Sequence, residues 1–212
     1  RYGRNMVLAP KPIEHHIAEL RHGLHCAALN YEIWWAYKEK NSRQKYAGTM
    51  NQYTPFFQTG IHAHFVAYVV AMYGLFEKRK DTVNITRLIE TVKKSGKLDQ
   101  AVLAETEKLY RELKPIWVKV GILRNNVFGH RSEHVDAAAA FKQANTTPNE
   151  LMRFIESTRQ LLNVVTKAWD KTGYILNTGS GAAALRILED LRRYKQRTLT
   201  SRSTKRAKAT RR

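Results

Sequence analysis

Apolar residues recur at alternating intervals of three and four positions along most of this sequence. The clearest series comprises Ile13, Ile17, Leu20, Leu24, Ala27, Tyr31 and Trp34. This spacing places its members on one face of an α-helix, because such a helix turns once in about 3.6 residues. The alternation with a period of two that is typical of strands is nearly absent. The pattern therefore predicts an all-α protein whose first helix covers about 11–40.

Two more helices are expected in the first half of the chain. The polar stretch 41–53 should interrupt the helical pattern, and Thr54-Pro55 resembles an N-cap followed by a first helical residue. The helix that begins there should reach about Lys80, and it is apolar on nearly all sides, which is typical of the middle of a bundle. A short helix is expected over 84–94, because Ser95-Gly96 follows it.

Three helical segments are expected in the second half. Apolar residues keep the helical rhythm over 102–123 across Pro115, which should kink or break that helix. The segment 147–150 has the sequence of a capping box and should open a helix that reaches about Leu176. A last helix is expected over 182–196. Residues 1–196 are therefore predicted to form an up-and-down helical bundle.

The chain is strongly basic, and the charge is concentrated at its end. It has 37 Lys and Arg against 18 Asp and Glu, a formal net charge of +19. Residues 192–212 contain ten of these cations and no acid, and 197–212 are predicted to form a disordered basic tail, since they have little apolar surface to bury. Such a surplus favours a polyanionic partner, first nucleic acid and second an anionic membrane surface. The candidate RNA-binding residues of the tail are Arg202, Lys205, Arg206 and Lys208. The alternative is a tail that only increases solubility.

Cysteine and hydropathy patterns exclude two further classes. Cys26 is the single cysteine, so no internal disulfide framework exists, and a reducing, cytoplasmic setting is expected. The longest uninterrupted apolar run, 65–76, has 12 residues, whereas a membrane span needs about 20. No membrane partner and no signal peptide are therefore expected.

The segment 123–131 carries the residues best suited to chemistry. It offers two guanidinium groups, one imidazole and two carboxamides, from Arg124, Asn125, Asn126, His130 and Arg131. RNA cleavage by its own 2′-hydroxyl needs a group that moves a proton near neutral pH, and histidine does this. It also needs a fixed cation for the charge that grows on the phosphate oxygens, which an arginine supplies. The segment has no carboxylate, so no metal and no other cofactor are expected.

The spacing raises two geometric questions. Arg124 and His130 are six positions apart, about 240° around an ideal α-helix, so they share a face only if the arginine curls round or Gly129 loosens the helix. One chain also offers only one imidazole in this segment, whereas acid–base cleavage is most effective with two proton-transfer groups. A two-fold symmetric homodimer would supply both.

The motif Arg124-Asn125-x4-His130 resembles the signature of the HEPN superfamily of small helical bundles. The segments Tyr53-Thr54-Pro55-Phe56-Phe57 and Asn84-Ile85-Thr86-Arg87-Leu88-Ile89 are similar to those of its abortive-infection U-type branch. The resemblance covers roughly 12–176. The basic tail is not part of the family pattern, which leaves open an added targeting or ribosome-binding role.

The resemblance implies a metal-independent endoribonuclease that acts as a dimer, as a toxin or in antiviral growth arrest, with a possible antitoxin as partner. The catalytic arginine of the family corresponds to Arg124, its polar neighbour to Asn125 and its histidine to His130. Some toxin relatives are silenced by modification of a tyrosine two positions after the histidine. Ser132 stands there in this chain, so that form of silencing is not expected. The target could be tRNA, mRNA or rRNA.

Two other functional classes fit the same residues. One is a non-catalytic RNA- or ribosome-binding helical dimer whose tail makes the essential contacts. The other is a helical subunit that regulates a partner enzyme. In both cases Arg124 and His130 would have structural roles.

Two motifs suggest other chemistry, and both have simpler explanations. The stretch 130–134 reads H-x-x-E-H, a zinc-protease pattern, with Glu150 or Glu156 as a conceivable third ligand. The stretch 179–184 reads G-x-G-x-x-A, a pattern of dinucleotide-binding proteins, but a glycine hinge before a helix explains it better. Cys26 and the four tryptophans lie in apolar stripes and are expected in the core or, for the tryptophans, at a dimer interface; the latter are Trp34, Trp35, Trp117 and Trp169.

Overall fold

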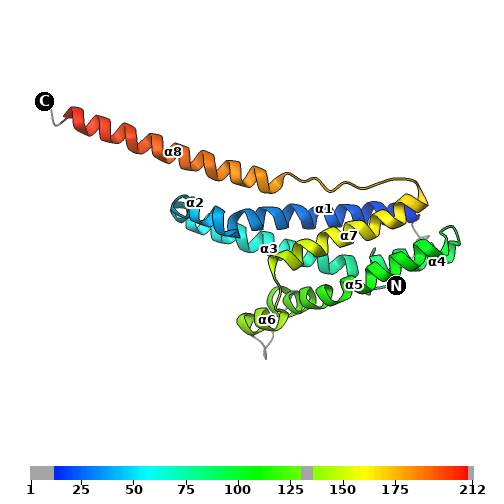
Figure 1. Ribbon diagram of the computed structural model, residues 1–212. Helices are drawn as coiled ribbons and strands as arrows, with labels where there is room; N and C mark the ends of the chain where they lie inside the picture. The colour runs from blue at the N-terminus through cyan, green and yellow to red at the C-terminus, as the bar shows by residue number, and fades with distance from the viewer. Residues whose placement is uncertain (1–11, 130–135, 210–212) are drawn as a thin grey trace, which may run out of the picture. The chain divides into compact units, whose positions relative to one another are not determined.

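The computed structural model describes residues 12–129 and 136–209, for 199–209 the backbone alone. All regular elements in this part of the chain are helices (Figure 1), which confirms the all-α prediction. The described chain forms two compact units, one from residues up to Cys26 together with Val69–Leu176, the other from Ala27–Tyr68 together with the residues from Asn177 onward. Each unit is described by itself. The domain boundary at residue 196 stays a prediction.

The first unit contains most of the helices in the middle of the chain. They are α4 (Ile85–Ser95), α5 (Gln100–Leu123), the π-helix η2 (Arg124–Gly129), α6 (Ala137–Ala144) and α7 (Pro148–Trp169), with the beginning of α1 (Ile13–Lys38) and the end of α3 (Thr54–Phe76). The helix α5 packs against α4, α6 and α7. Phe76 and Phe154 lie in the core of the unit, with ring centroids 5.0 Å apart, and both are almost completely buried.

Side-chain caps fix the ends of these helices where the sequence indicated them. Asn84 is the N-cap of α4, and its side chain accepts a hydrogen bond from the backbone N–H of Arg87. Gly96 ends α4 with a φ of +65°, a left-handed conformation that glycine adopts without steric cost. Thr147 and Glu150 form the predicted capping box at the start of α7. These capped boundaries are confirmed.

Three boundaries differ from the sequence predictions. Pro115 lies inside α5, so the predicted break does not occur, since proline costs one hydrogen bond but its φ is helical, and buried Leu113 and Val120 hold the helix on either side. The alternative, a kink at this proline, stays a prediction. The helix α7 ends at Trp169 rather than near residue 176. The helix α6 was not predicted, because its run of alanines shows no spacing of large apolar residues; Asp136 caps it.

The second unit contains α2 (Lys40–Met50), the 3₁₀-helix η1 (Asn51–Tyr53), α8 (Ser180–Ala209), and the remaining parts of α1 and α3. The interruption predicted for 41–53 is wrong, because most of this stretch is helical and only Glu39 separates α1 from α2. The side chain of Glu39 caps α2 by accepting a hydrogen bond from the N–H of Ser42. Few residues of α2 are buried, so its apolar pattern was too weak to detect. Thr54 is itself helical and is not an N-cap.

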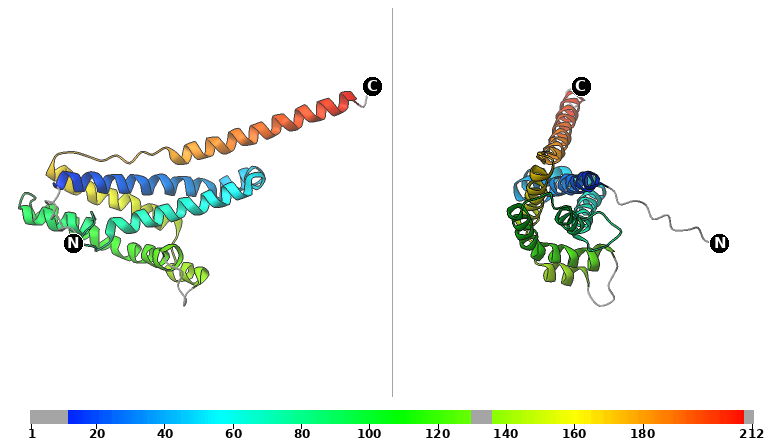
Figure 2. Two further views of the ribbon diagram at one scale, coloured as in Figure 1. Left: turned by 180° about the vertical axis from the view of Figure 1, so that it is seen from behind. Right: turned by 90° about the vertical axis from the view of Figure 1, so that its right-hand side faces the viewer.

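The core of this unit joins four helices. It consists of Ala36, Tyr37, Tyr46, Phe57, Ala184 and Leu188. The helix α2 packs against α8. The predicted end of the last helix was Gln196, whereas the backbone of α8 is helical to Ala209, and Figure 2 shows it as one uninterrupted ribbon. The stretch after Gln196 contains neither glycine nor proline, so no residue there stops a helix.

By length and composition, one stretch of the described helices, Lys40–Phe76, could cross a membrane, although only 33% of its most apolar window is buried. The count of uninterrupted apolar residues missed it, because Gln58, Thr59, His62 and His64 break the run without adding a formal charge. The core helices of soluble proteins meet the same criteria. Composition therefore does not by itself assign this stretch to a membrane.

A carboxylate on α8 holds that helix to α2. Glu189 accepts a hydrogen bond from the Tyr46 hydroxyl at 3.1 Å and pairs with Lys45 at 3.2 Å, and Arg192 and Arg193 contact it from its own helix. These donors, Arg192 first, lower the pKa of Glu189 from 4.5 to about 2. The carboxylate form is therefore favoured in the folded protein.

We expect the contacts of the Glu189 carboxylate to stabilise the fold fully above about pH 4.5. This stabilisation should be lost as the pH falls toward 2, because the pKa of Glu189 is lower in the folded than in the unfolded state. Glu189→Gln should lower the Tm at pH 7, and its difference from wild type should vanish near pH 2. Thermal unfolding followed by circular dichroism over this pH range measures the effect. Glu112→Gln, at an exposed position of α5, is the matched control; an equal effect of both variants would contradict the prediction.

Candidate functional site

The Arg-Asn motif begins where the α-helix changes into a wider one. Regular α5 ends at Leu123, and Arg124–Gly129 form the π-helix η2, in which hydrogen bonds join residues five positions apart. Such segments are rare and occur frequently at functional sites. From the sequence, we expected either that the arginine side chain curls round or that Gly129 loosens the helix. The described residues show a helix that is already wider from Arg124 onward. His130 and Arg131 lie outside the described residues, so their position relative to Arg124 stays a prediction.

Arg124 is held by an aromatic ring and an amide. Its guanidinium carbon lies 5.0 Å from the centroid of the Tyr73 ring, and its Nη1 donates to Oδ1 of Asn125 at 3.0 Å. Among the described residues, no carboxylate lies within ion-pair distance of Arg124. The ring and the amide orient the side chain without neutralising it, so the positive charge remains available to an anion.

A shallow pocket of about 360 Å³ lies beside this arginine. Its walls come from the end of α3, the last turns of α5 and the start of η2; they are Tyr73, Trp117, Val118, Gly121, Ile122, Asn125 and Asn126. The Tyr73 and Trp117 rings stack with centroids 5.9 Å apart. A Cβ at position 121 would lie 3.4 Å from the Tyr73 ring, so glycine there permits the close approach of the two helices.

Sequence reasoning found only part of this pocket. Asn126 was a candidate and lines it, and Asn125 was a candidate and both lines it and contacts Arg124. Trp117, expected in the core or at a dimer interface, is half-buried on the pocket wall, and its indole N–H is buried without a hydrogen-bond acceptor in the described structure. Its spacing of seven positions from Arg124 was a usable signal, since it places both on one face of α5. Tyr73 was missed, because only the tertiary packing of α3 on α5 brings it there.

The remaining predicted residues lie outside the described side chains. This holds for the four candidates of the tail, which are Arg202, Lys205, Arg206 and Lys208, although the backbone of α8 passes through all of them. The structure therefore brings together Arg124, Asn125 and Asn126. A contribution from the tail stays a prediction.

The possible zinc ligands that are described have other partners. Glu150 pairs with Lys119 at 2.7 Å and accepts a hydrogen bond from the backbone of Thr147, and these contacts, Lys119 first, lower the pKa of the Glu150 carboxyl. Glu156 pairs with Arg159 at 2.9 Å. No cluster of three potential metal ligands occurs among the described residues. The H-x-x-E-H stretch itself lies outside these residues, so Glu150 and Glu156 are the only members of the possible zinc site that the structure describes.

The glycine-rich stretch 179–184 is explained by packing against α1. Gly179 has a φ of +61°, and α8 begins at Ser180. The Glu32 carboxylate accepts hydrogen bonds from the Ser180 hydroxyl at 3.0 Å and from the N–H of Gly181 at 3.1 Å. A Cβ at position 181 would lie 3.2 Å from the Glu32 carbonyl oxygen. A protein carboxylate therefore occupies the place that a dinucleotide phosphate would need.

The other aromatic and thiol predictions need a small correction. All four tryptophans are half-buried rather than enclosed in the core. Trp34 stacks on Phe65 with centroids 4.9 Å apart, and the Trp169 indole donates to Glu14 at 2.9 Å. Cys26 is half-buried on α1, and its Sγ lies 3.6 Å from Nε2 of His22. Cys26 and each of the four tryptophans therefore keep part of their surface exposed to solvent. Their positions in apolar stripes of the sequence did not indicate this exposure.

Helices are the only regular elements in the described ranges, and the Arg-Asn-x4-His segment follows a long helix, an arrangement that is typical of the HEPN superfamily. The model of the family described as AbiU2, a branch of this superfamily, matches residues 10–190, and the chain therefore belongs to that family. No curated protein and no solved structure matches the chain. The family match confirms the resemblance seen in the sequence. HEPN domains are often ribonucleases, which makes RNA chemistry the first function to consider for Arg124.

Proposed function

We propose that this protein is a metal-independent endoribonuclease that acts as a homodimer in the cytoplasm, as a toxin or in antiviral defence. The observation that carries the proposal is Arg124, a cation oriented by Tyr73 and Asn125 with no carboxylate partner among the described residues. It stands beside an open pocket with aromatic and amide walls, which is suited to a nucleotide. Membership of the family supports the same chemistry.

The proposed reaction needs no group beyond the RNA and the protein. The 2′-oxygen of a ribose attacks the adjacent phosphorus, and the bond from phosphorus to the 5′-oxygen breaks. One histidine takes the proton of the 2′-hydroxyl, and a second histidine, in its protonated form, donates a proton to the leaving 5′-oxygen. Arg124 stabilises the additional charge on the phosphate oxygens. The products are a 2′,3′-cyclic phosphate and a 5′-hydroxyl.

His130 is the proposed proton-transfer group, and a two-fold dimer would bring two copies of it to one cleft. Asn125 positions Arg124 through their hydrogen bond. The RNA target is a tRNA, an mRNA or an rRNA, and a neutralising antitoxin is the proposed protein partner. A strictly monomeric but active form, measured by light scattering during chromatography, would contradict the dimer.

Incubation of purified full-length wild type and His130→Ala with total RNA in EDTA tests the proposal. Wild type should produce fragments that end in a 2′,3′-cyclic phosphate, and His130→Ala should produce none while it still binds RNA in a filter assay. Equal cleavage by both proteins would show that the activity does not come from this motif.

A non-catalytic RNA-binding role is the second candidate, and the ten cations of residues 192–212 favour it. Under this alternative, deletion of 198–212 removes RNA binding, Arg124→Ala has no effect, and no preparation cleaves RNA. The same incubation therefore distinguishes the two candidates.

A further inference from the structure

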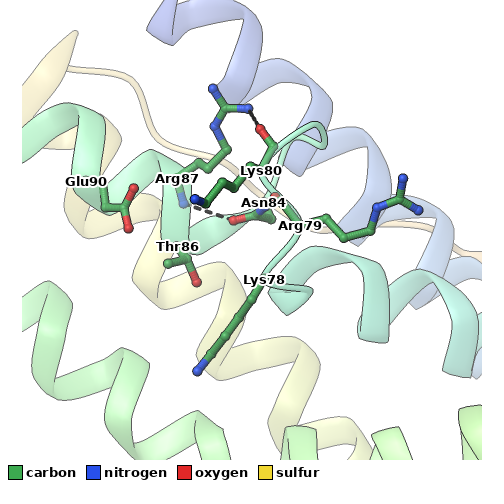
Figure 3. A pocket seen from close by; sticks show the side chains of 7 residues that line it. All are labelled: Lys78, Arg79, Lys80, Asn84, Thr86, Arg87 and Glu90. Carbon is green, nitrogen blue, oxygen red and sulfur yellow. Dashed lines mark hydrogen bonds between the residues drawn. The ribbon is translucent and has the colours of Figure 1, made fainter.

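A second pocket, of about 520 Å³, lies where the loop after α3 meets the start of α4 (Figure 3). It is lined by Lys78, Arg79, Lys80, Asn84, Thr86, Arg87 and Glu90. Four of these residues are cationic and one is acidic. The balance of charge on the pocket therefore favours an anionic ligand.

The loop that carries the cations is held in place by one buried amide. Asn84 is 1% exposed, and its Nδ2 donates to the carbonyl oxygens of Arg79 at 2.9 Å and Thr82 at 3.2 Å. Its Oδ1 accepts from the backbone N–H of Arg87 at 2.9 Å, and the Arg87 guanidinium donates to the carbonyl of Lys80. The backbone from Arg79 to Arg87 is thus pinned at several points, so a ligand would not have to order it.

Two of the four cations have partners within the loop and two are free to bind a ligand. Arg79 pairs with Asp81 at 2.6 Å, and Arg87 is engaged with the loop carbonyl. Lys78 and Lys80 are exposed, and neither forms an ion pair with another described residue. In the view of Figure 3 the amines of Lys78 and Lys80 lie on the same side of the loop as Thr86 and Glu90 of α4. The Arg79 side chain extends to the opposite side.

The helix α5 connects this pocket to Arg124. The Thr86 hydroxyl on the pocket wall is hydrogen bonded to the Tyr110 hydroxyl at 2.9 Å. Tyr110, Trp117 and Arg124 are seven positions apart, so they lie within about 40° of one another around α5. The axial distance from Tyr110 to Arg124 is about 21 Å, at a rise of 1.5 Å for each of 14 residues. Tyr73 covers the middle of this face by stacking on Trp117.

We propose that Lys78 and Lys80 form a remote phosphate-binding subsite for the RNA strand whose scissile phosphate lies at Arg124. This inference rests on the proposed function and deepens it, since it makes the substrate a single strand several nucleotides long. At 3.4 Å per nucleotide, about six nucleotides of stacked strand span the 21 Å from Tyr110, which contacts the pocket wall through Thr86, to Arg124. Tyr73 and Phe76 of α3 stack on Trp117 and Tyr110, so the strand would pass over these aromatic side chains rather than stack its bases on α5.

The test measures binding of labelled single-stranded RNA by fluorescence anisotropy, with full-length His130→Ala as the parent so that no substrate is cut. The parent should bind a 12-nucleotide strand at least about 10-fold more tightly than a 4-nucleotide strand, which is too short to reach both sites. Adding Lys78→Ala and Lys80→Ala should abolish this gain and reduce the salt dependence, by about 0.7 in log K against log salt for each phosphate that the protein no longer neutralises. Glu90→Gln should tighten binding of the longer strand.

The matched control removes two exposed lysines outside the pocket, by Lys108→Ala and Lys167→Ala, and should keep the gain with length. An equal loss in the control, or an unchanged gain in the Lys78 and Lys80 variant, would overturn the subsite. Binding of ATP that depends on the two lysines while the RNA affinities do not change would also overturn it and would assign the pocket to a free nucleotide. If wild type fails to cut RNA but the length effect depends on these lysines, the proposed cleavage fails and the subsite stands.

Discussion

Arg124→Ala is expected to slow RNA cleavage by about 10²–10³-fold, because removal of one donor that stabilises a developing oxyanion has an effect of this size. The guanidinium has no described carboxylate partner whose charge would be left behind, so the variant should fold normally. Arg124→Lys should restore only part of the rate, since an ammonium cannot reproduce the planar, two-pronged contact with a phosphate or the stacking on Tyr73.

Single-turnover cleavage of one labelled RNA, with protein in excess, measures this effect without interference from product release. Arg111→Ala is the control, because it removes an exposed arginine from α5, the helix that directly precedes η2. Full recovery of the rate by Arg124→Lys would mean that a point charge is sufficient. A rate for Arg124→Ala within about two-fold of wild type would remove this arginine from the mechanism.

Phe154→Ala should have the largest effect on stability, a loss of about 3–5 kcal/mol in the free energy of unfolding. Phe154 is fully buried on α7 and contacts the Phe76 ring in a tilted arrangement, and Phe76 itself stacks on Tyr110 of α5. Its truncation would leave a cavity where α3, α5 and α7 meet. The same rings position the face of α5 that leads to Arg124, so the variant should also lose activity at temperatures below its Tm.

Urea unfolding followed by circular dichroism gives the free energy from the midpoint and the slope. Met152→Ala, two residues earlier on α7 and 37% exposed, should cost less than about 1 kcal/mol. Similar midpoints for the two variants would show that the aromatic cluster does not carry the stability of this unit. A changed slope for Phe154→Ala would instead indicate a change in the compactness of one of the two states.

The sequence predicted the fold best where the signal was local. Asn84, Gly96 and the Thr147–Glu150 capping box marked their helix ends correctly, because a cap depends on residues within one turn of it. The helices α2 and α6 were missed, since one buries few residues and the other is rich in alanine, so neither shows a strong apolar period. Pro115 does not end its helix, because packing on both sides maintains it.

The candidate site was predictable in its motif but not in its surroundings. Arg124, Asn125 and Asn126 share one short segment and could be read from the sequence. Tyr73 lies 51 positions earlier, and its contact with Arg124 follows only from the packing of α3 on α5. The basic pocket was overlooked for a different reason: Lys78, Arg79 and Lys80 are adjacent, but Arg87 joins them only through the loop that the hydrogen bonds of the buried Asn84 shape, and this leaves no periodic signal.

The π-helix also makes the orientation of the motif residues around the helix axis sensitive to the number of residues in this segment. A π-turn contains one residue more than the α-turn that it replaces, and one residue corresponds to about 100° of rotation around the helix. Loss of a single residue between Asn125 and Phe128 would therefore let the segment relax into an ordinary helix and swing everything after it by more than a quarter of a circle. The direction in which the chain leaves Gly129 thus depends on the one additional residue of the π-turn. A single one-residue insertion or deletion in this segment would change that direction.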